Sequence, residues 1–270
     1  MPNTKIDALV SQINDGATLC VPVSRSGIAM EATRRLIARK ISNLHLIAIP
    51  TSGLQADMLI GAGAVSVMES AGVTLDEFGQ APRFVAAVKA GGIRLRDSTC
   101  PAIISALQAG EKGIPFIPMR GLIGSDLLNY RDDYRVIDNP MSIEPDPIVA
   151  LPAIVPDVAL FHTPLGDTSG NVWIGNMREL MTMAHASKST LVTVEEITGH
   201  NLLADPLRAP ATIPATYITH IAEARNGAWP LALAGCYEAD TDALAAYAGM
   251  AQTKSGFQTF MDEASLHAAG

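Results

Sequence analysis

The sequence predicts an α/β domain built on an open, mostly parallel sheet with helices on both faces. Two observations indicate this class. Short apolar segments alternate with segments of helical spacing along most of the chain, as in repeated strand–helix units. The apolar segments are also nearly continuous in hydrophobic residues, which is typical of parallel strands buried on both faces. Because the chain shows no internal repeat or flexible linker, residues 1–270 are expected to form a single domain.

The expected elements are separated by residues that stop regular structure. The turn Asn14-Asp15-Gly16 precedes the first strand, and Pro50-Thr51-Ser52-Gly53 follows the second. Pro101 suits a first helical turn, and Gly110 closes the same helix. The expected strands are 17–23, 44–49, 64–68, 93–97, 114–117, 147–156, 158–162 and 190–194. The expected helices are 6–13, 28–40, 54–60, 83–90, 101–109, 177–186 and, broken at Gly256, 241–269.

The stretch 112–128 is expected to hold the centre of a binding site. Its apolar run 114–117 is predicted to be a buried parallel strand, and the chain breaks immediately afterwards at Met119-Arg120-Gly121. Ligands of open α/β sheets bind in the crevice at the carboxyl ends of the strands. The Arg120 guanidinium and the backbone at Gly121 would offer that crevice a site for a carboxylate or phosphate. A structural ion pair is the alternative interpretation of Arg120.

Composition excludes several classes of function. The net charge of −8, with no basic stretch, argues against nucleic acid as a partner. No apolar run reaches the ~18 residues of a membrane span, and a secretory leader is not expected. Three widely separated cysteines indicate buried thiols in a reducing cytoplasm rather than a disulfide or metal framework. With 48% hydrophobic and only 17% charged residues, some apolar surface is expected to be covered by another subunit.

Individual side chains give weaker signals. Among the histidines, His162 ends a strand and is the one expected to line a site, whereas His45 and His185 are interpreted as structural. Glu195 and Glu196 follow a strand, but alternation directs them to opposite faces, so they cannot act as a pair. Ser98 lies where a strand meets a helix N-terminus, which suits both a cap and an anion-binding corner.

Four sequence blocks follow one another along the chain: PTSGLQADMLIGAGAVSVMES (from Pro50), LQAGEKGIPFIPMRGLIGSDLL (from Leu107), HTPLGDTSGN (from His162) and TLVTVEEI (from Thr190). In this order they resemble the A subunit of family I CoA-transferases, of the glutaconate CoA-transferase type. The resemblance covers about residues 15–225. It implies the CoA-transferase (NagB/RpiA-like) α/β fold and a homologous B subunit that completes the active site.

The resemblance also implies the chemistry. The acyl-CoA is attacked by a glutamate that lies in a Ser-Glu-Asn-Gly type motif of the B subunit. CoA then moves, through anhydride and glutamyl-CoA thioester intermediates on that subunit, to a small or dicarboxylic acid. Coenzyme A thioester is then a substrate, and no cofactor or metal is permanently bound. This chain lacks the motif, so no catalytic residue is assigned to it. By position in the family pattern, the expected substrate-binding residues are Ser24, Gly27, Ser52, Gly53, Ser98, Arg120 and Gly121.

One departure from the family leaves alternatives open. Relatives usually carry a glycine-rich turn after the first strand, where this chain has Val21-Pro22-Val23-Ser24. The departure indicates an altered substrate and puts backbone contacts at this turn in doubt. CoA-ester hydrolases, decarboxylases and ring-cleaving enzymes share the scaffold and remain alternatives. A sugar-phosphate sensor is a third, non-enzymatic possibility, but no DNA-binding helix-turn-helix accompanies this domain.

A first prediction concerns Arg120. If its guanidinium contacts substrate, Arg120→Ala weakens turnover of the enzyme assembled with its partner, because the anion loses its planar two-point donor. The unfolding midpoint should stay unchanged. Steady-state kinetics and thermal denaturation check this, and full activity of the variant would remove Arg120 from the site.

Overall fold

The computed structural model describes residues 4–267, with side chains described to Ala264. The helices are α1 (Ile6–Val10), α2 (Met30–Ala38), α3 (Leu54–Gly61), α4 (Pro82–Lys89), α5 (Cys100–Glu111), α6 (Leu127–Tyr130), α7 (Glu179–Ala186), α8 (Thr241–Met250) and α9 (Lys254–His267). The strands are β1 (Thr18–Pro22), β2 (Leu44–Ile49), β3 (Val65–Ser70), β4 (Arg94–Asp97), β5 (Phe116–Met119), β6 (Arg135–Asp138), β7 (Pro147–Pro152), β8 (Val158–Asp167), β9 (Val172–Trp173), β10 (Ser189–Thr198), β11 (Thr212–Ile213) and β12 (His220–Glu223).

The main sheet confirms the predicted class. Its parallel strands run in the order β12-β10-β8-β1-β2-β3-β4, and the short strands β9 and β11 add an antiparallel edge beside β8. Side chains of α1, α2 and α3 pack on one face, around Leu19 and Leu46. Side chains of α5 and α7 pack on the other face, around Ile47 and Phe161. Both faces are therefore buried, as the continuous apolar strands indicated.

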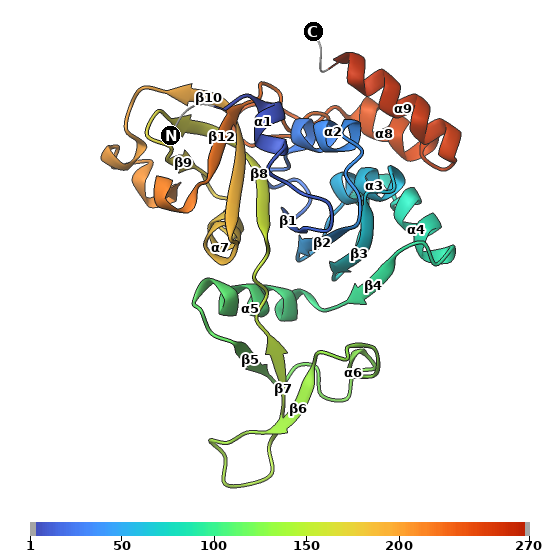
Figure 1. Cartoon of the computed structure of the whole chain (residues 1–270), viewed down its shortest axis with the longest axis vertical. Coiled ribbons are helices and arrows are strands. Elements are labelled where there is room, and N and C mark those ends of the chain that lie inside the picture. The colour runs from blue at the N-terminus through green and yellow to red at the C-terminus, as the bar shows by residue number, and fades with distance from the viewer. Residues whose placement is uncertain (1–3, 268–270) are drawn as a thin grey trace.

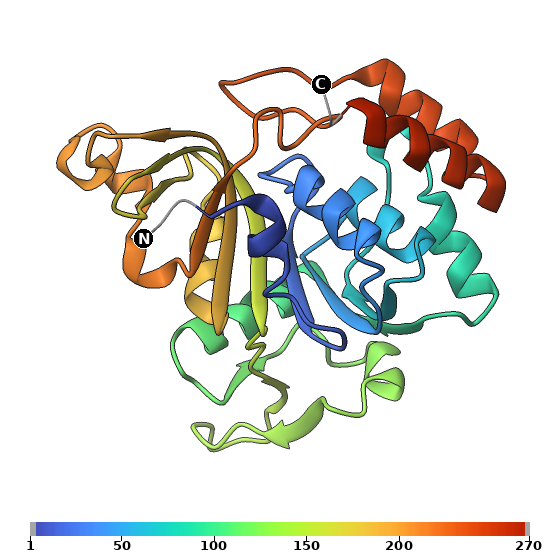
Figure 2. The ribbon, with the colours of Figure 1, turned by 45° about the horizontal axis from the view of Figure 1, so that its top comes forward.

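The C-terminal helices α8 and α9 form a third packing layer. Tyr247, Phe257 and Phe260 pack with Leu54 and Met58 of α3. Figures 1 and 2 both show this pair (red) beside the helical layer that contains α3 and α4. As a result, α8 covers the loops that follow β2 and β3.

The prediction of a buried parallel strand at 114–117 is wrong in both the partner strands and the burial. β5 belongs to a separate antiparallel sheet of order β5-β7-β6, and Phe116 is 45% exposed. The residues that form this sheet and α6, 116–152, are called the small lobe; it projects from the α5 side of the main sheet (Figure 1). The physical reason is the pair of prolines, Pro115 and Pro118, which cannot donate backbone hydrogen bonds and therefore favour an edge strand.

The cysteine expectation holds only for Cys20, which is buried in the main sheet, where burial raises the pKa of its thiol. Cys100 and Cys236 are exposed. All three are free thiols. Cys100 begins α5 and Cys236 lies in a loop, and both positions are at the surface. The local sequence pattern did not indicate this exposure, because a thiol is apolar enough to be expected in the core.

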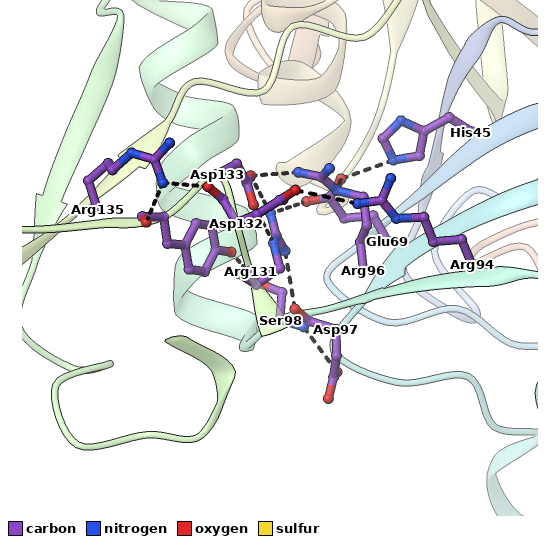
Figure 3. A network of polar contacts seen from close by, with 11 residues as sticks. His45, Glu69, Arg94, Arg96, Asp97, Ser98, Arg131, Asp132, Asp133 and Arg135 are labelled. Carbon is purple, nitrogen blue, oxygen red and sulfur yellow. Dashed lines mark hydrogen bonds and ion pairs between the residues drawn. The ribbon is translucent and has the colours of Figure 1, made fainter. Parts of the chain in front are cut away.

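A buried ion network joins the small lobe to the main sheet (Figure 3). The Arg131 guanidinium donates to the Glu69 carboxylate of β3 at 2.8 Å and to Asp133 at 2.9 Å. Arg96 of β4 pairs with the same two acids, and His45 Nε2 lies 3.0 Å from Glu69 Oε2. Burial alone would raise the pKa of Glu69, but the His45 hydrogen bond and the charges of Arg131 and Arg96 outweigh it and lower that pKa.

Removing the Arg131 side chain should therefore destabilise the folded protein. Arg131→Met leaves Glu69 and Asp133 without their central cation, and we expect the free energy of unfolding to fall by about 3 kcal/mol or more. Arg94→Met is the matched control, because Arg94 is 62% exposed and lies 3.9 Å from Asp132; it should change stability by less than about 0.5 kcal/mol. Chemical denaturation measures both, and equal effects of the two variants would show that the network contributes little.

Candidate functional site

The turns that follow β1, β2 and β3 meet at the carboxyl edge of the main sheet. The turn after β2 pairs with the turn after β3, since the Ser52 N–H donates to Gly72 O at 3.1 Å and the Thr74 N–H donates to Ser52 O at 3.0 Å. A narrow pocket, partly open to solvent, lies between these turns and α8. Its lining includes Ser24, Arg25, Ile28, Gly53, Leu54, Gln55, Thr74, Leu75, Asp76, Phe78, Leu231, Leu244 and Tyr247.

Two of the predicted site glycines are required for this convergence. A Cβ at Gly53 would lie 2.7 Å from the carbonyl oxygen of Thr74 and 2.8 Å from Ser24 Oγ. At Gly27, φ is +69° and a Cβ would lie 2.6 Å from the carbonyl oxygen of His162. Any side chain at either position would push the turns apart, so the glycines have a steric role whatever else they contact.

Unpaired polar atoms gather beside this pocket. Ser24 Oγ, Ser52 Oγ and Gln55 Oε1 are buried and have no hydrogen-bond partner among residues 4–267. Buried polar groups are nearly always paired in folded proteins, so such a cluster marks a place where another molecule or water is bound. Gln55 was not expected from the sequence, although its position at the start of a helix that follows a strand was a usable signal.

A second polar cluster lies at the ends of β8 and β10. His162 Nε2 contacts Glu195 Oε1 at 2.7 Å, and the Tyr237 hydroxyl donates to the same oxygen at 2.7 Å. The backbone N–H groups of Asn226 and Gly227 also donate to the carboxylate, at 2.8 and 3.0 Å. Burial alone would raise the pKa of Glu195, but these hydrogen bonds, led by that of His162, lower it.

This cluster has the outline of a nucleophile–histidine–acid relay, because Thr193 Oγ1 lies 2.8 Å from His162 Nδ1. Thr193 and His162 are both fully buried, so no substrate reaches either side chain. Four donors already hold the Glu195 carboxylate, which lowers its nucleophilicity. The cluster therefore stabilises the loop at 226–228, whose Gly227 carbonyl accepts from the Glu31 N–H of α2 at 2.9 Å.

The other predicted residues lie elsewhere. Ser98 is at the carboxyl end of β4, where its Oγ lies 3.0 Å from the Tyr134 hydroxyl, and the helix cap is supplied by Thr99, which accepts from the Ala102 N–H. Arg120 and Gly121 lie on the small lobe, because β5 is not in the main sheet. The Arg120 side chain is 68% exposed and pairs with Asp146, as the ion-pair interpretation anticipated.

Glu195 and Glu196 behave differently, as strand alternation predicted: Glu195 joins the cluster and Glu196 is exposed. Asp167 forms an Asx turn, accepting from the N–H groups of Ser169 and Asn171. Within the described residues, no group of three or more His, Cys, Asp or Glu side chains is placed to hold a metal ion. Over the same residues, no helix has the length and hydropathy needed to cross a membrane.

Glu195→Gln tests the second cluster. The amide keeps the size of the side chain but puts an N–H₂ group among four donors, so the free energy of unfolding should fall by about 2 kcal/mol near neutral pH. Because the pKa of Glu195 is lowered on folding, its contribution is present above the ordinary value of about 4.5 and is lost as pH falls through the folded value. The difference between wild type and variant should shrink on acidification, whereas Glu196→Gln should show no difference at any pH. A gap that widened at low pH would contradict this.

Comparisons with known proteins identify the family to which this chain belongs. A family model described as coenzyme A transferase matches residues 3–224, so the chain belongs to the coenzyme A transferase family. The chain is 28% identical over 264 residues to the A subunit of 3-oxoadipate CoA-transferase from Pseudomonas knackmussii, covering 95% of this chain and 90% of that one. It is 29% identical over 230 residues to the A subunit of glutaconate CoA-transferase from Acidaminococcus fermentans, covering 77% and 69%.

The chain is also similar to a hydrolase subunit and to two solved structures. The chain is 26% identical over 265 residues to the cholesterol ring-cleaving hydrolase IpdA subunit of Rhodococcus jostii, covering 95% and 89%. Among solved structures, glutaconate CoA-transferase from Acidaminococcus fermentans superposes with a TM-score of 0.89 at 24% identity, covering 97% and 88%. The decarboxylase AibA/AibB superposes with a TM-score of 0.85 at 24% identity, covering 98% of both chains. The family and fold inferred from the sequence are thus confirmed.

Proposed function

We propose that this chain is the A subunit of a two-subunit CoA-transferase, which moves CoA between an acyl-CoA and a small carboxylic acid. The observation that carries the proposal is the meeting of the turns after β1, β2 and β3 at one pocket with unpaired polar atoms, in a chain of the coenzyme A transferase family. Ser24, Gly27, Ser52 and Gly53 would form the substrate-facing wall. Ser98 would lie farther along the same sheet edge.

The attacking carboxylate would come from a homologous B subunit. The chain lacks a Ser-Glu-Asn-Gly motif, and Glu195, which lies in one of its family blocks, is already held by four donors. Two relatives are named as A subunits, which supports the existence of a partner. So does the small lobe, which exposes large apolar side chains including Phe116, Tyr130 and Met141.

In the proposed reaction the partner's glutamate attacks the thioester carbonyl of the acyl-CoA, forming an acyl–glutamyl anhydride and releasing CoA thiolate. The thiolate then attacks the glutamyl carbonyl, which frees the donor acid and leaves a glutamyl-CoA thioester. The acceptor carboxylate attacks that thioester, which forms a second acyl–glutamyl anhydride and releases the CoA thiolate again. The thiolate then attacks the acyl carbonyl of this anhydride, which gives the new acyl-CoA and frees the glutamate carboxylate. The role of this chain is to orient the two acids and to exclude water from the anhydride.

A CoA-ester hydrolase or lyase on the same two-subunit scaffold is the second candidate. It is favoured by the likeness to the cholesterol ring-cleaving hydrolase subunit, which covers nearly the whole chain. The two candidates differ in the fate of the anhydride or thioester. Transfer requires that an acid intercept it, whereas hydrolysis requires that water reach it.

The test is to assay the chain alone and after co-production with a homologous chain that carries a Ser-Glu-Asn-Gly motif. The chain alone should be inactive toward an acyl-CoA with a free acid, because it supplies no nucleophile. The complex should form a new acyl-CoA only when an acceptor acid is present, as followed by chromatography of the thioesters. Release of free CoA without an acceptor would identify a hydrolase, and turnover by the isolated chain would contradict the proposal.

A further inference from the structure

We propose that the pocket beside β1, β2 and β3 receives the distal end of an acyl chain that carries a hydroxyl group, bound between Gln55 and Ser24. This inference rests on the proposed function and narrows its substrate class. It starts from the unpaired oxygens of these two side chains, both of which line the pocket.

The orientation of the Gln55 amide is set by its neighbours. Gln55 is 1% exposed, and its Nε2 donates to Thr33 Oγ1 at 2.9 Å. The Thr33 hydroxyl uses its one proton to donate to the Ala29 carbonyl at 2.8 Å, so toward Gln55 it can only accept. The amide nitrogen must therefore face Thr33. The carbonyl oxygen, Oε1, is left as an acceptor without a donor.

Ser24 supplies the complementary group. Its hydroxyl can donate as well as accept, and its Oγ has no partner within the described chain. Gln55 Oε1 and Ser24 Oγ are not hydrogen-bonded to each other, although both residues line the pocket. An aliphatic hydroxyl fits this pair, because it can donate to Gln55 and accept from Ser24 at the same time.

The remaining lining suits a hydrocarbon chain. Most of the other lining side chains are apolar, among them Ile28, Leu54 and Leu231. The Tyr247 hydroxyl is already used, since it donates to Asp57 at 2.7 Å, so Tyr247 offers the pocket its ring. An acyl chain of a few methylene groups with one hydroxyl matches this surface.

A second carboxylate does not match it. The cation in the lining, Arg25, is already paired with Asp76 at 3.2 Å and with Glu77. Asp76 also lines the pocket, and Gln55 presents an acceptor oxygen rather than a donor. A buried carboxylate would meet acceptors and negative charge without a free cation. The preferred acid should thus differ from the diacids in the names of the 3-oxoadipate and glutaconate enzymes.

The experiment compares three acceptor acids of equal length in the two-subunit complex: 5-hydroxypentanoate, pentanoate and pentanedioate. For the wild-type complex, kcat/KM should be about fivefold higher with 5-hydroxypentanoate than with pentanoate, which is the effect of one net hydrogen bond. It should be lowest with pentanedioate. Gln55→Leu should abolish the preference for the hydroxy acid, so that the ratio of kcat/KM for 5-hydroxypentanoate to that for pentanoate falls to about one. Ser24→Ala, which removes only a hydroxyl, should reduce the preference. Gln108→Leu, at an exposed glutamine of α5, is the matched control and should leave it intact.

A binding measurement separates this inference from the proposed function. In thermal denaturation of the complex, 5-hydroxypentanoate should raise the unfolding midpoint of wild type and of the Gln108→Leu variant but not that of Gln55→Leu. If no acid accepts CoA but the hydroxy acid still stabilises through Gln55, the transferase proposal fails and the pocket assignment stands. If transfer occurs with pentanedioate preferred, or if both Gln55→Leu and Ser24→Ala keep the wild-type preference, the pocket assignment is overturned. Absence of any shift with 5-hydroxypentanoate would likewise overturn it and leave water as the partner of these oxygens.

Discussion

The parallel register of β1, β2 and β3 is the constraint on which the site depends. Parallel strands deliver the turns that follow them to one edge, and here the registers Pro22 with Ile49 and Ile47 with Glu69 keep those ends level. The turns can then touch through Gly53 and Ser24, and α8 closes the space from the other side. Without that alignment the unpaired oxygens of Gln55 and Ser24 would face separate surroundings.

Two polar clusters of this chain satisfy their charges internally, whereas the pocket does not satisfy all of its polar atoms. The network around Glu69 is balanced, with arginines and acids in nearly equal number, so it holds the small lobe without offering a free charge. The Glu195 cluster is also satisfied, by donors from three separate parts of the chain. The pocket is the contrast, because two of its polar atoms, Ser24 Oγ and Gln55 Oε1, lack partners. A buried amide oxygen without a donor marks a position that another molecule or water can occupy.

Most of the fold was predictable because strand and helix alternate with a clear period and with sharp breaks at Pro and Gly. The predicted helices at 54–60 and 101–109 correspond closely to α3 and α5. The pairing of the small lobe was missed because a short apolar run by itself looks the same in a buried parallel strand and in an edge strand. Pro115 and Pro118 were the local signal that favoured the edge strand. In the site, Ser24, Gly27, Ser52 and Gly53 came from the family pattern. Tyr237 was missed because its role depends on a contact with Glu195 that no local pattern contains. Gln55 was missed because its orientation depends on Thr33, although its place at the start of a helix after a strand was a usable signal.

The small lobe leaves and rejoins the main body at neighbouring points. The Ala153 N–H donates to the Pro115 carbonyl at 3.1 Å, and the Ile154 N–H donates to the Ala106 carbonyl at 2.9 Å. The chain between those points is therefore an insertion whose two ends are held together by backbone hydrogen bonds. Such an insertion can lengthen, shorten or change shape over evolutionary time while the order of the strands in the main sheet stays the same. That freedom offers one physical route by which enzymes on a common scaffold could acquire different quaternary contacts.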